Sequence, residues 1–289
     1  MKIREVIDRI LDYHPHIEGY EGCDAFKCGD PDAECTGVVC AMSPTIHVIR
    51  KAIELGANLI VVHEPTFYTS ADEDGWFEEF GNAVYEEKRK LLDDHGIAIW
   101  RDHDHMHAND PDSIFAGVLK YMGWEDRAQI DTDTGLFAHY LVEIEETSVE
   151  DLCRKLIDTI GLNGARVVGD PQARVSRIAL VGHLFPNDYT RKDGSKGEYS
   201  VKVIETLEKK ADLIIPGEVI DWTVLSYIRD AVQLGHVKAA VCIGHYNWEE
   251  LGMRYMKDWL PGLLNNEVKV TYVPSEDMYS YVLKEEKPC

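Results

Sequence analysis

The chain has 289 residues, a length that favours two domains. Its 30 Lys and Arg residues against 52 Asp and Glu residues give a net charge of −22, which opposes binding to nucleic acid or to an anionic membrane. No apolar run approaches the roughly 20 residues that span a bilayer, and the N-terminal segment lacks the apolar core of a signal peptide. We therefore expect a cytoplasmic protein without a nucleic-acid or membrane partner.

The first part of the chain alternates patterns typical of helices and strands. Helical spacing begins the chain, and a loop rich in Gly, Asp and Cys follows it. Pro44 and Gly56 suit the start and end of a later helix. The expected elements are a helix over 3–13, a loop over 17–35, strands over 37–42, 57–62 and 97–100, and helices over 44–55, 76–95 and 111–122.

The pattern of apolar and polar residues changes near residue 131. The expected elements there are strands over 136–144, 175–180, 213–215, 239–243 and 268–273, a helix over 148–160 and a polar loop over 185–198. This alternation predicts an α/β fold. We expect one domain formed by residues 1–130 and 236–289, and a second domain formed by residues 131–235.

Two of the apolar runs end in side chains that commonly bind metals. One stops at His63 and Glu64, and the other, near residue 243, is followed by His245 and Glu249. A four-residue spacing places His245 and Glu249 on one face of a helix. Because open α/β sheets carry ligand sites at the C-terminal ends of their strands, the pattern predicts a metal site assembled from both ends of the chain.

A third apolar run, over 97–100, leads to His103, His105 and His107. On an extended segment alternate side chains face the same side, so all three imidazoles could lie together. We expect His107 to bind metal and His103 or His105 to transfer protons, because imidazole titrates near neutral pH. The alternative is a solvated polar loop. Imidazole and carboxylate ligands together suit Zn, Mn, Fe, Co or Ni.

The remaining candidates carry less weight. Glu218 follows a strand, where a turn residue or a partner that orients a metal ligand is favoured over a direct ligand. His183 also follows a strand. The sequence contains no Walker loop, Gly-x-Ser-x-Gly elbow or Gly-x-Gly-x-x-Gly motif, which leaves P-loop NTPase, serine hydrolase and dinucleotide-binding functions without support.

Four of the seven cysteines, Cys23, Cys28, Cys35 and Cys40, are close together in the sequence. Their C-x4-C-x6-C-x4-C spacing lacks the C-x2-C pairs of ordinary zinc ribbons. A structural zinc and a disulfide are the alternatives, but unpaired thiols are favoured in a chain of this size and expected location.

Three segments carry a resemblance to a known family. They run from Thr36 to Phe67, from Gly96 to His107, and over 211–218 together with 243–249. They resemble the Nif-three-like proteins, a dinuclear-metal family whose members often carry the name type 2 GTP cyclohydrolase I. The resemblance covers nearly the whole chain and is weakest over 131–200. It implies an α/β fold with two similar lobes, mixed sheets flanked by helices, a metal cleft at the C-terminal strand ends, and a homo-oligomer, often a hexamer.

The chain departs from the family pattern at two expected ligands. Glu64 stands where the family has a second histidine, and His107 stands where it has an aspartate. Together with His63, His245 and Glu249 they still make three histidines and two carboxylates, so the ligand charge is unchanged. The resemblance therefore implies that these five residues hold two divalent transition metal ions.

The leading hypothesis is a dinuclear-metal-dependent hydrolase, with a nucleotide, a phosphoester or a cyclic amide as its small-molecule substrate and GTP as one candidate. An enzymatic alternative is an amidohydrolase or phosphoesterase that uses His103, His105 and His107. Such enzymes usually require a barrel of eight βα units, which this pattern does not supply. A non-enzymatic alternative is a metal-binding regulator or metal carrier.

Overall fold

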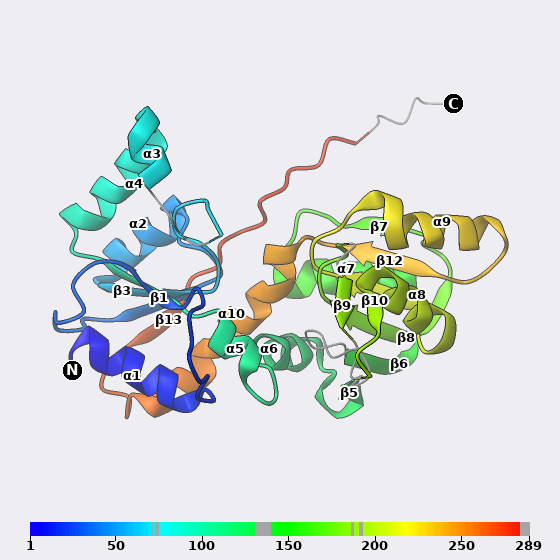
Figure 1. Ribbon diagram of the computed structural model, residues 1–289, viewed down its shortest axis with the longest axis horizontal. Helices are drawn as coiled ribbons and strands as arrows, with labels where there is room; N and C mark the ends of the chain where they lie inside the picture. The colour runs from blue at the N-terminus through cyan, green and yellow to red at the C-terminus, as the bar shows by residue number, and fades with distance from the viewer. Residues whose placement is uncertain (71, 73–74, 131–139, 186–187, 191–192, 284–289) are drawn as a thin grey trace. The chain divides into compact units, whose positions relative to one another are not determined.

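The computed structural model describes residues 1–70, 72, 75–130, 140–185, 188–190 and 193–283. The chain divides into two compact units, the first formed by Met1–Val118 and Glu249–Ser275 and the second by Leu119–Trp248 and Glu276–Cys289. Each unit contains a mixed sheet flanked by helices, which confirms the expected α/β fold (Figure 1). Within the described ranges, no helix combines the length and the apolar character needed to cross a membrane.

The first unit is built on a five-stranded sheet with the order β1-β4-β3-β2-β13. Strand β1 is antiparallel to β4, whereas β4, β3, β2 and β13 run parallel to one another. Its elements are α1 (Ile3–Tyr13), β1 (Ala25–Cys28), β2 (Val38–Ala41), α2 (Ile46–Leu55), β3 (Leu59–Val62), α3 (Gly75–Phe80), α4 (Ala83–Asp94), β4 (Ala98–Arg101), α5 (Asp104–Ala108) and β13 (Val270–Tyr272).

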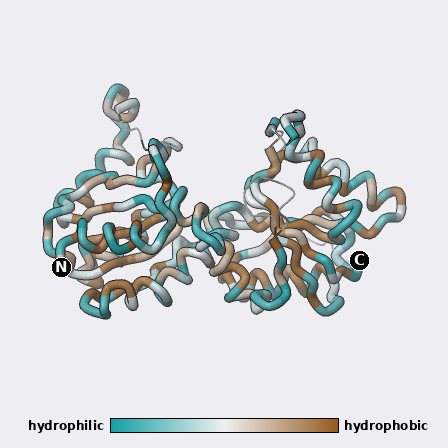
Figure 2. Tube along the Cα trace, turned by 60° about the horizontal axis from the view of Figure 1, so that its bottom comes forward, coloured by the Kyte–Doolittle hydropathy of each residue, from teal (hydrophilic) through white to brown (hydrophobic). Residues whose placement is uncertain are grey.

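The central strands of this sheet are buried on both faces, as their unbroken apolar sequences require. Helices α2 and α4 pack on one face, and α1 lies on the other (Figure 1). The expected C-terminal end of α2 is confirmed, because Gly56 adopts a left-handed φ of 68°. The helix begins two residues after Pro44, and the Thr45 side chain caps it by accepting a hydrogen bond from the Val48 amide. Figure 2 shows hydrophobic residues along the interior strands of each unit.

The second unit contains a six-stranded sheet with the order β5-β6-β8-β11-β12-β7 and a separate β9–β10 hairpin. Its three central strands β8, β11 and β12 are parallel, and the outer strands are antiparallel. Its elements are η1 (Glu125–Arg127), β5 (Ala128–Ile130), β6 (Tyr140–Ser148), α7 (Val149–Ile160), β7 (Arg166–Val168), β8 (Arg174–Val181), β9 (Asp188–Thr190), β10 (Lys196–Glu198), α8 (Tyr199–Lys209), β11 (Leu213–Pro216), η2 (Asp221–Leu225), α9 (Ser226–Gln233) and β12 (Ala239–Cys242).

Two helices, α6 (Ser113–Met122) and α10 (His245–Leu263), contain points at which the chain passes from one unit to the other. The expected boundary at residue 236 differs from this division. Strand β12 pairs with β11 in the second sheet, so the chain rejoins the first unit only at Glu249.

Three local expectations also differ from the structure. The loop expected over 17–35 includes strand β1, which pairs with β4. The helix expected over 76–95 is two helices, α3 and α4, separated at Gly81 and at Asn82, whose side chain caps α4. The loop expected over 185–198 includes the β9–β10 hairpin. The first part of the strand expected over 136–144 lies outside the described residues. Both large sheets are open in the described parts of the chain, so the barrel that the amidohydrolase alternative needs is not formed.

Candidate metal centre

The ends of β3 and β4 place His63 at the C-terminal edge of the first sheet. The two strands are parallel, and Val62 pairs with Arg101, so His63 and Asp102 leave the sheet side by side. The Asp102 amide donates a hydrogen bond of 2.8 Å to the Val62 carbonyl. The His63 amide in turn donates to the Met42 carbonyl at the end of β2, at 3.2 Å. Backbone hydrogen bonds therefore fix the position of His63 before its side chain makes any contact.

The side chain of His63 is held as a neutral imidazole with its Nε2 lone pair available. Its Nδ1 lies 3.0 Å from the Asp102 carbonyl oxygen, which can only accept, so Nδ1 carries the proton. Burial, followed by repulsion from the His103 and His107 imidazoles, lowers the pKa of His63 to about 3. The imidazole side chain is 0% exposed. This is the tautomer that a metal-binding histidine adopts when a carbonyl orients it.

The Nε2 atom of His63 faces the Glu249 carboxylate. The distance from Nε2 to Glu249 Oε2 is 3.3 Å. Within the described part of the chain, Nε2 has no hydrogen bond of acceptable geometry. An imidazole lone pair and a carboxylate oxygen are both ligands of divalent transition metal ions. The pair therefore has the chemistry of two ligands of one metal ion.

Two further imidazoles surround His63, both supplied by the segment after β4. The His103 ring stacks on the His63 ring with 4.3 Å between centroids, and the His107 ring meets it edge-on at 4.9 Å. One ligand atom from each of the three residues lies within 4.8 Å of the others. These residues converge because His103 caps α5 and His107 lies four positions later, on the same helical face.

Carboxylates orient both of these imidazoles from behind. His107 Nδ1 lies 2.9 Å from Asp112 Oδ2, and His103 Nδ1 lies 2.8 Å from Asp104 Oδ1. Because a carboxylate accepts, Nδ1 carries the proton in both rings and Nε2 keeps a lone pair. A carboxylate behind the imidazole is the usual arrangement of metal-binding histidines.

His105 does not join this group. The segment is the helix α5, where the sequence pattern suggested an extended chain, so the residue two positions after His103 turns to another side. Its Nδ1 lies 2.7 Å from the Asp24 carboxylate, and its ring packs 4.6 Å from the ring of Tyr20. This environment does not place His105 beside His63.

Glu64 and Glu249 contribute carboxylates to the same region. One ligand atom from each lies within 4.8 Å of the other and of a His63 ring nitrogen, and all three residues are buried. The Arg101 guanidinium lies 3.6 Å from Glu64 Oε2. Arg101 also donates from Nε to the His63 carbonyl oxygen at 3.1 Å, so it balances one buried carboxylate and fixes the turn that carries it.

In the second unit, the parallel strands β8, β11 and β12 are followed by His183, Glu218 and His245. His183 and His245 meet edge-on with 4.4 Å between ring centroids, and His245 Nδ1 lies 3.5 Å from Glu218 Oε1. The Glu218 amide donates a 3.0 Å hydrogen bond to His183 Nδ1. A side chain at Gly217 would crowd this contact, since its Cβ would lie 2.6 Å from His183 Nδ1.

The structure thus brings together four of the five expected ligands within the first unit: His63, Glu64, His107 and Glu249. The fifth, His245, belongs to the second unit, four residues before Glu249 on α10. Its approach to His63 stays a prediction. Sequence reasoning missed Asp24, Asp112 and Arg101, because their roles depend on contacts that no local motif announces.

The described cysteines are free thiols, as expected. Cys28 and Cys40 are buried, and Cys35 makes a weak contact with the Gly37 carbonyl oxygen at 3.7 Å. Cys23 lies against Asp104, close to His103. A cluster of all four thiols is therefore not formed.

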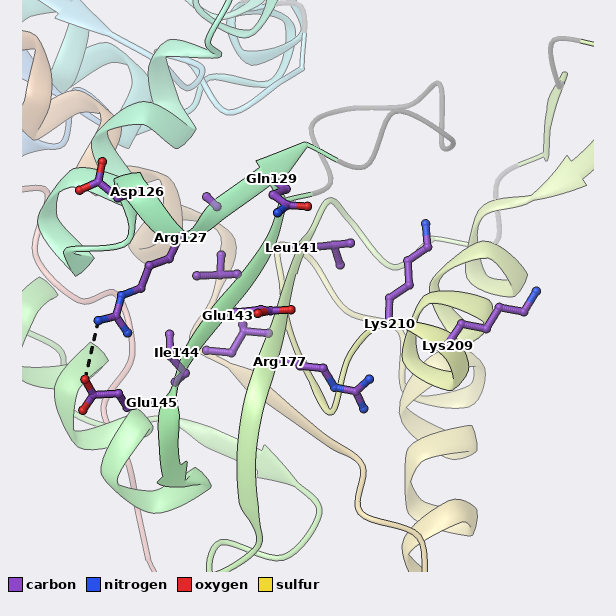
Figure 3. A pocket seen from close by; sticks show the side chains of 13 residues that line it. Asp126, Arg127, Gln129, Leu141, Glu143, Ile144, Glu145, Arg177, Lys209 and Lys210 are labelled. Atoms are coloured by element: carbon purple, nitrogen blue, oxygen red, sulfur yellow. Dashed lines mark ion pairs between the residues drawn. The ribbon is translucent and has the colours of Figure 1, made fainter.

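A cavity of about 720 Å³ lies in the second unit over β5, β6 and β8 (Figure 3). Its charged residues include Arg127, which pairs with Glu145 at 3.8 Å, and Arg177, which pairs with Asp212 at 2.6 Å. None of the histidines lines this cavity. Its lining residues include neither an imidazole nor a thiol, so the cavity lacks the ligands that a transition metal ion prefers.

Comparison with known proteins places this geometry in context. The model of the Duf34/NIF3 (NGG1p interacting factor 3) family matches residues 1–278. A Clostridium perfringens protein named GTP cyclohydrolase 1 type 2 homolog is 25% identical over 264 residues, which cover 86% of this chain and 87% of that protein. A Staphylococcus aureus protein of the same name is 29% identical over 161 residues, but the match covers 54% of this chain and 41% of that protein.

Solved structures share the fold. A Staphylococcus aureus hypothetical protein matches with a TM-score of 0.70 and 19% identity, over 98% of this chain and 99% of that chain. A Bacillus cereus protein related to NIF3 matches with a TM-score of 0.68 and 14% identity, over the same shares. These identities are low, so the two matches carry the fold and nothing finer.

Proposed function

This chain belongs to the Duf34/NIF3 family, and from that premise we propose that it is a dinuclear-metal-dependent hydrolase. His63, Glu64, His107, His245 and Glu249 would hold two divalent transition metal ions. Glu249 or Glu64 would contribute to both ions, because each carboxylate offers two oxygens.

The observation that carries the proposal is the contact between His63 Nε2 and Glu249 Oε2, at 3.3 Å. The His63 Nδ1 faces the Asp102 carbonyl oxygen, so Nε2 carries a lone pair, and the His63 side chain is fully buried. An imidazole lone pair and a carboxylate oxygen are both ligands of divalent transition metal ions. A cation between the two atoms would therefore bind both.

The residues fit a borderline metal. Imidazole and carboxylate ligands suit Zn, Mn, Fe, Co or Ni, and the Asp112 carboxylate holds His107 in the tautomer that binds metal through Nε2. The substitution pair at Glu64 and His107 leaves three histidines and two carboxylates, so the expected ligand charge is retained. Reconstitution with each metal in turn would show which of them supports turnover.

When bound, the metal ions would polarise a carbonyl or phosphoryl oxygen and lower the pKa of water. The protein residues would position the substrate and move protons. His103 fits proton transfer best, since its side chain is 24% exposed and Asp104 holds its Nδ1 proton. His105 fits less well, because the buried Asp24 carboxylate engages it away from the other imidazoles.

The substrate class we propose is a nucleotide, a phosphoester or a cyclic amide. GTP is one candidate, because relatives carry the name GTP cyclohydrolase 1 type 2 homolog. A homo-oligomer, with a hexamer as one form, and a cytoplasmic location belong to the same proposal. Light scattering across a wide concentration range would test the assembly, and a monomer throughout would contradict it.

A screen of metals against substrates tests the activity. Metal-free protein reconstituted separately with Zn²⁺, Mn²⁺, Co²⁺ or Fe²⁺ is assayed on phosphodiesters, GTP and cyclic amides, with His63→Ala as the paired control. Turnover by the wild type that is lost in His63→Ala supports the hydrolase. Metal bound in two equivalents without turnover on any substrate would overturn it in favour of a metal-binding regulator or carrier.

A further inference from the structure

Three side chains outside the five proposed ligands form a second group of metal-binding type. They are Cys23, His103 and Asp104, all partly buried, and one ligand atom from each lies within 4.8 Å of the others. A thiol, an imidazole and a carboxylate together are ligands of zinc-like ions. The group differs in this from the neighbouring histidines and glutamates, which offer no sulfur.

The carboxylate of Asp104 is oriented so that one oxygen faces the other two side chains. Its Oδ2 accepts from the Tyr20 hydroxyl at 2.8 Å and from the Cys23 amide at 3.3 Å. Its Oδ1 lies 2.8 Å from His103 Nδ1 and 3.7 Å from Cys23 Sγ. Oδ1, Nδ1 and Sγ therefore converge, while the other oxygen is occupied by donors that hold the carboxylate in place.

A second, buried carboxylate fastens the cysteine loop to α5. Asp24 accepts from the backbone amides of His103, Asp104 and His105 at 2.8, 3.0 and 2.9 Å. Its side chain is 0% exposed. Because Asp24 directly follows Cys23, these three bonds fix the thiol beside the start of the helix.

The backbone of the loop packs closely against Asp104 and Tyr20. A side chain at Gly22 would collide with the Asp104 carboxylate and with the Tyr20 hydroxyl. The chain therefore carries glycine at the point where its backbone passes closest to the carboxylate. The juxtaposition of the three ligand atoms is a property of the packed loop and helix.

We propose that Cys23 Sγ, His103 Nδ1 and Asp104 Oδ1 form an auxiliary site for one zinc-like divalent ion. Zinc-to-sulfur and zinc-to-oxygen distances of about 2.3 and 2.0 Å in a tetrahedron give a sulfur-to-oxygen separation of about 3.5 Å. The observed 3.7 Å is close to this value. Three protein ligands leave a fourth position for water or an exogenous ligand.

Binding at this site displaces the proton of the Cys23 thiol and the Nδ1 proton of His103. An ion there would therefore withdraw His103 from proton transfer. The site goes beyond the proposed hydrolase and does not depend on it, since none of its three ligands is among the five residues assigned to the dinuclear pair.

Titration with Co²⁺ tests the auxiliary site, because a thiolate bound to Co²⁺ gives a near-ultraviolet charge-transfer absorption that imidazole and carboxylate ligands do not. The full chain should develop this band. Cys23→Ser should lose it, whereas Cys35→Ser, which changes another partly buried thiol, should keep it. Absence of the band in the wild type, or its survival in Cys23→Ser, would overturn the proposal.

Two further variants separate this result from the dinuclear centre and from misfolding. His63→Ala removes a proposed ligand of the buried pair and should leave the band intact, so failure of the dinuclear proposal would not imitate failure of this one. Asp104→Asn should raise the Co²⁺ concentration at half-maximal absorption at least about tenfold. An unchanged midpoint in Asp104→Asn, with the far-ultraviolet circular dichroism of the wild type, would also overturn the site.

Discussion

Each unit ends parallel strands in histidines, yet the two groups present their protons in opposite ways. In the first unit, His63 donates from Nδ1 to a carbonyl and keeps a lone pair on Nε2. In the second, His183 accepts at Nδ1 from the Glu218 amide, so a neutral His183 carries its proton on Nε2. The backbone group at the end of the neighbouring strand, a carbonyl in one case and an amide in the other, sets the tautomer.

The difference extends to the carboxylates. The Glu249 side chain beside His63 is 7% exposed, whereas the Glu218 side chain beside His245 is 51% exposed. Water can solvate Glu218, but Glu249 depends on protein groups or a cation. Similar strand ends thus acquire different chemistry: His63 presents a buried Nε2 lone pair beside a buried carboxylate, whereas neutral His183 carries its proton on Nε2.

Removing one histidine from each group should give the largest difference in metal affinity between the two groups. His63→Ala should weaken metal binding more than about 100-fold, because loss of a direct ligand should exceed the 10–100-fold cost of losing an outer partner. His183→Ala should cost less than His63→Ala. Equilibrium dialysis with Zn²⁺ measures both, with His95→Ala at the exposed end of α4 as the control. Equal losses at His63 and His183 would remove the distinction.

Asp112→Asn tests whether the carboxylate behind His107 sets the tautomer of its imidazole. In the wild type, Asp112 Oδ1 accepts hydrogen bonds from the Ile114 and Phe115 amides, and the asparagine oxygen can keep both. The asparagine NH2 group then takes the place of Oδ2 beside His107. An amide donor there would favour the wrong tautomer of His107. Metal affinity should fall about 10–100-fold, with little change in the unfolding midpoint of the metal-free protein. Unchanged affinity would show that His107 is not a ligand.

Exchange of partners within the first group should be non-additive. Glu64→His leaves four histidines and one carboxylate, and His107→Asp leaves two histidines and three carboxylates. The double variant restores three histidines and two carboxylates. Its free energy of metal binding should therefore be more favourable than the sum of the single losses predicts, by roughly 0.5–3 kcal/mol. Calorimetric metal titration of all four proteins gives the coupling. Strictly additive losses would place Glu64 and His107 in separate sites.

The low pKa of His63 predicts a pH dependence of stability in the metal-free protein. The unfolded chain binds the proton near the ordinary imidazole pKa of about 6.5, and the folded chain only near about 3. Between these values the unfolded state binds more protons. The contribution of the neutral His63 imidazole to the free energy of unfolding is therefore complete above about pH 6.5. It is lost as the pH falls towards 3, at up to about 1.4 kcal/mol per pH unit.

Urea unfolding between pH 4 and 6.5 measures this slope. His63→Asn keeps an amide donor for the Asp102 carbonyl but does not titrate, so it should flatten the dependence relative to the wild type. His95→Asn, at an exposed position, should not. Identical slopes in the wild type and His63→Asn would mean that the His63 imidazole accepts a proton in the folded state as readily as in the unfolded chain.

The sequence predicted the edge of the first sheet well for a physical reason. Apolar runs buried on both faces become parallel strands, and parallel strands deliver the next residue to one shared edge. His63 and the segment from His103 were found in this way. The helical conformation of that segment was not predicted. Helix α5 begins where three backbone amides donate hydrogen bonds to the Asp24 carboxylate, which lies about 80 residues earlier in the chain. Such a cap has no signal in the local pattern.

The protonation states were equally invisible to sequence patterns. Whether an imidazole offers a lone pair depends on whether a carbonyl, an amide or a carboxylate stands at Nδ1, as Asp102, Glu218 and Asp112 show. The placement of β12 also escaped the sequence argument, because its apolar run fits either sheet. Its pairing with β11 is decided by the fold of the intervening chain.

Anomalous diffraction from crystals of metal-loaded protein tests the central claim most directly. Data collected on both sides of the absorption edge of the metal identify the ion and locate it. We expect an anomalous peak at coordination distance, about 2.0–2.2 Å, from both His63 Nε2 and a Glu249 oxygen, with a second peak beside it. Fully loaded crystals with no peak near His63 Nε2 would contradict it.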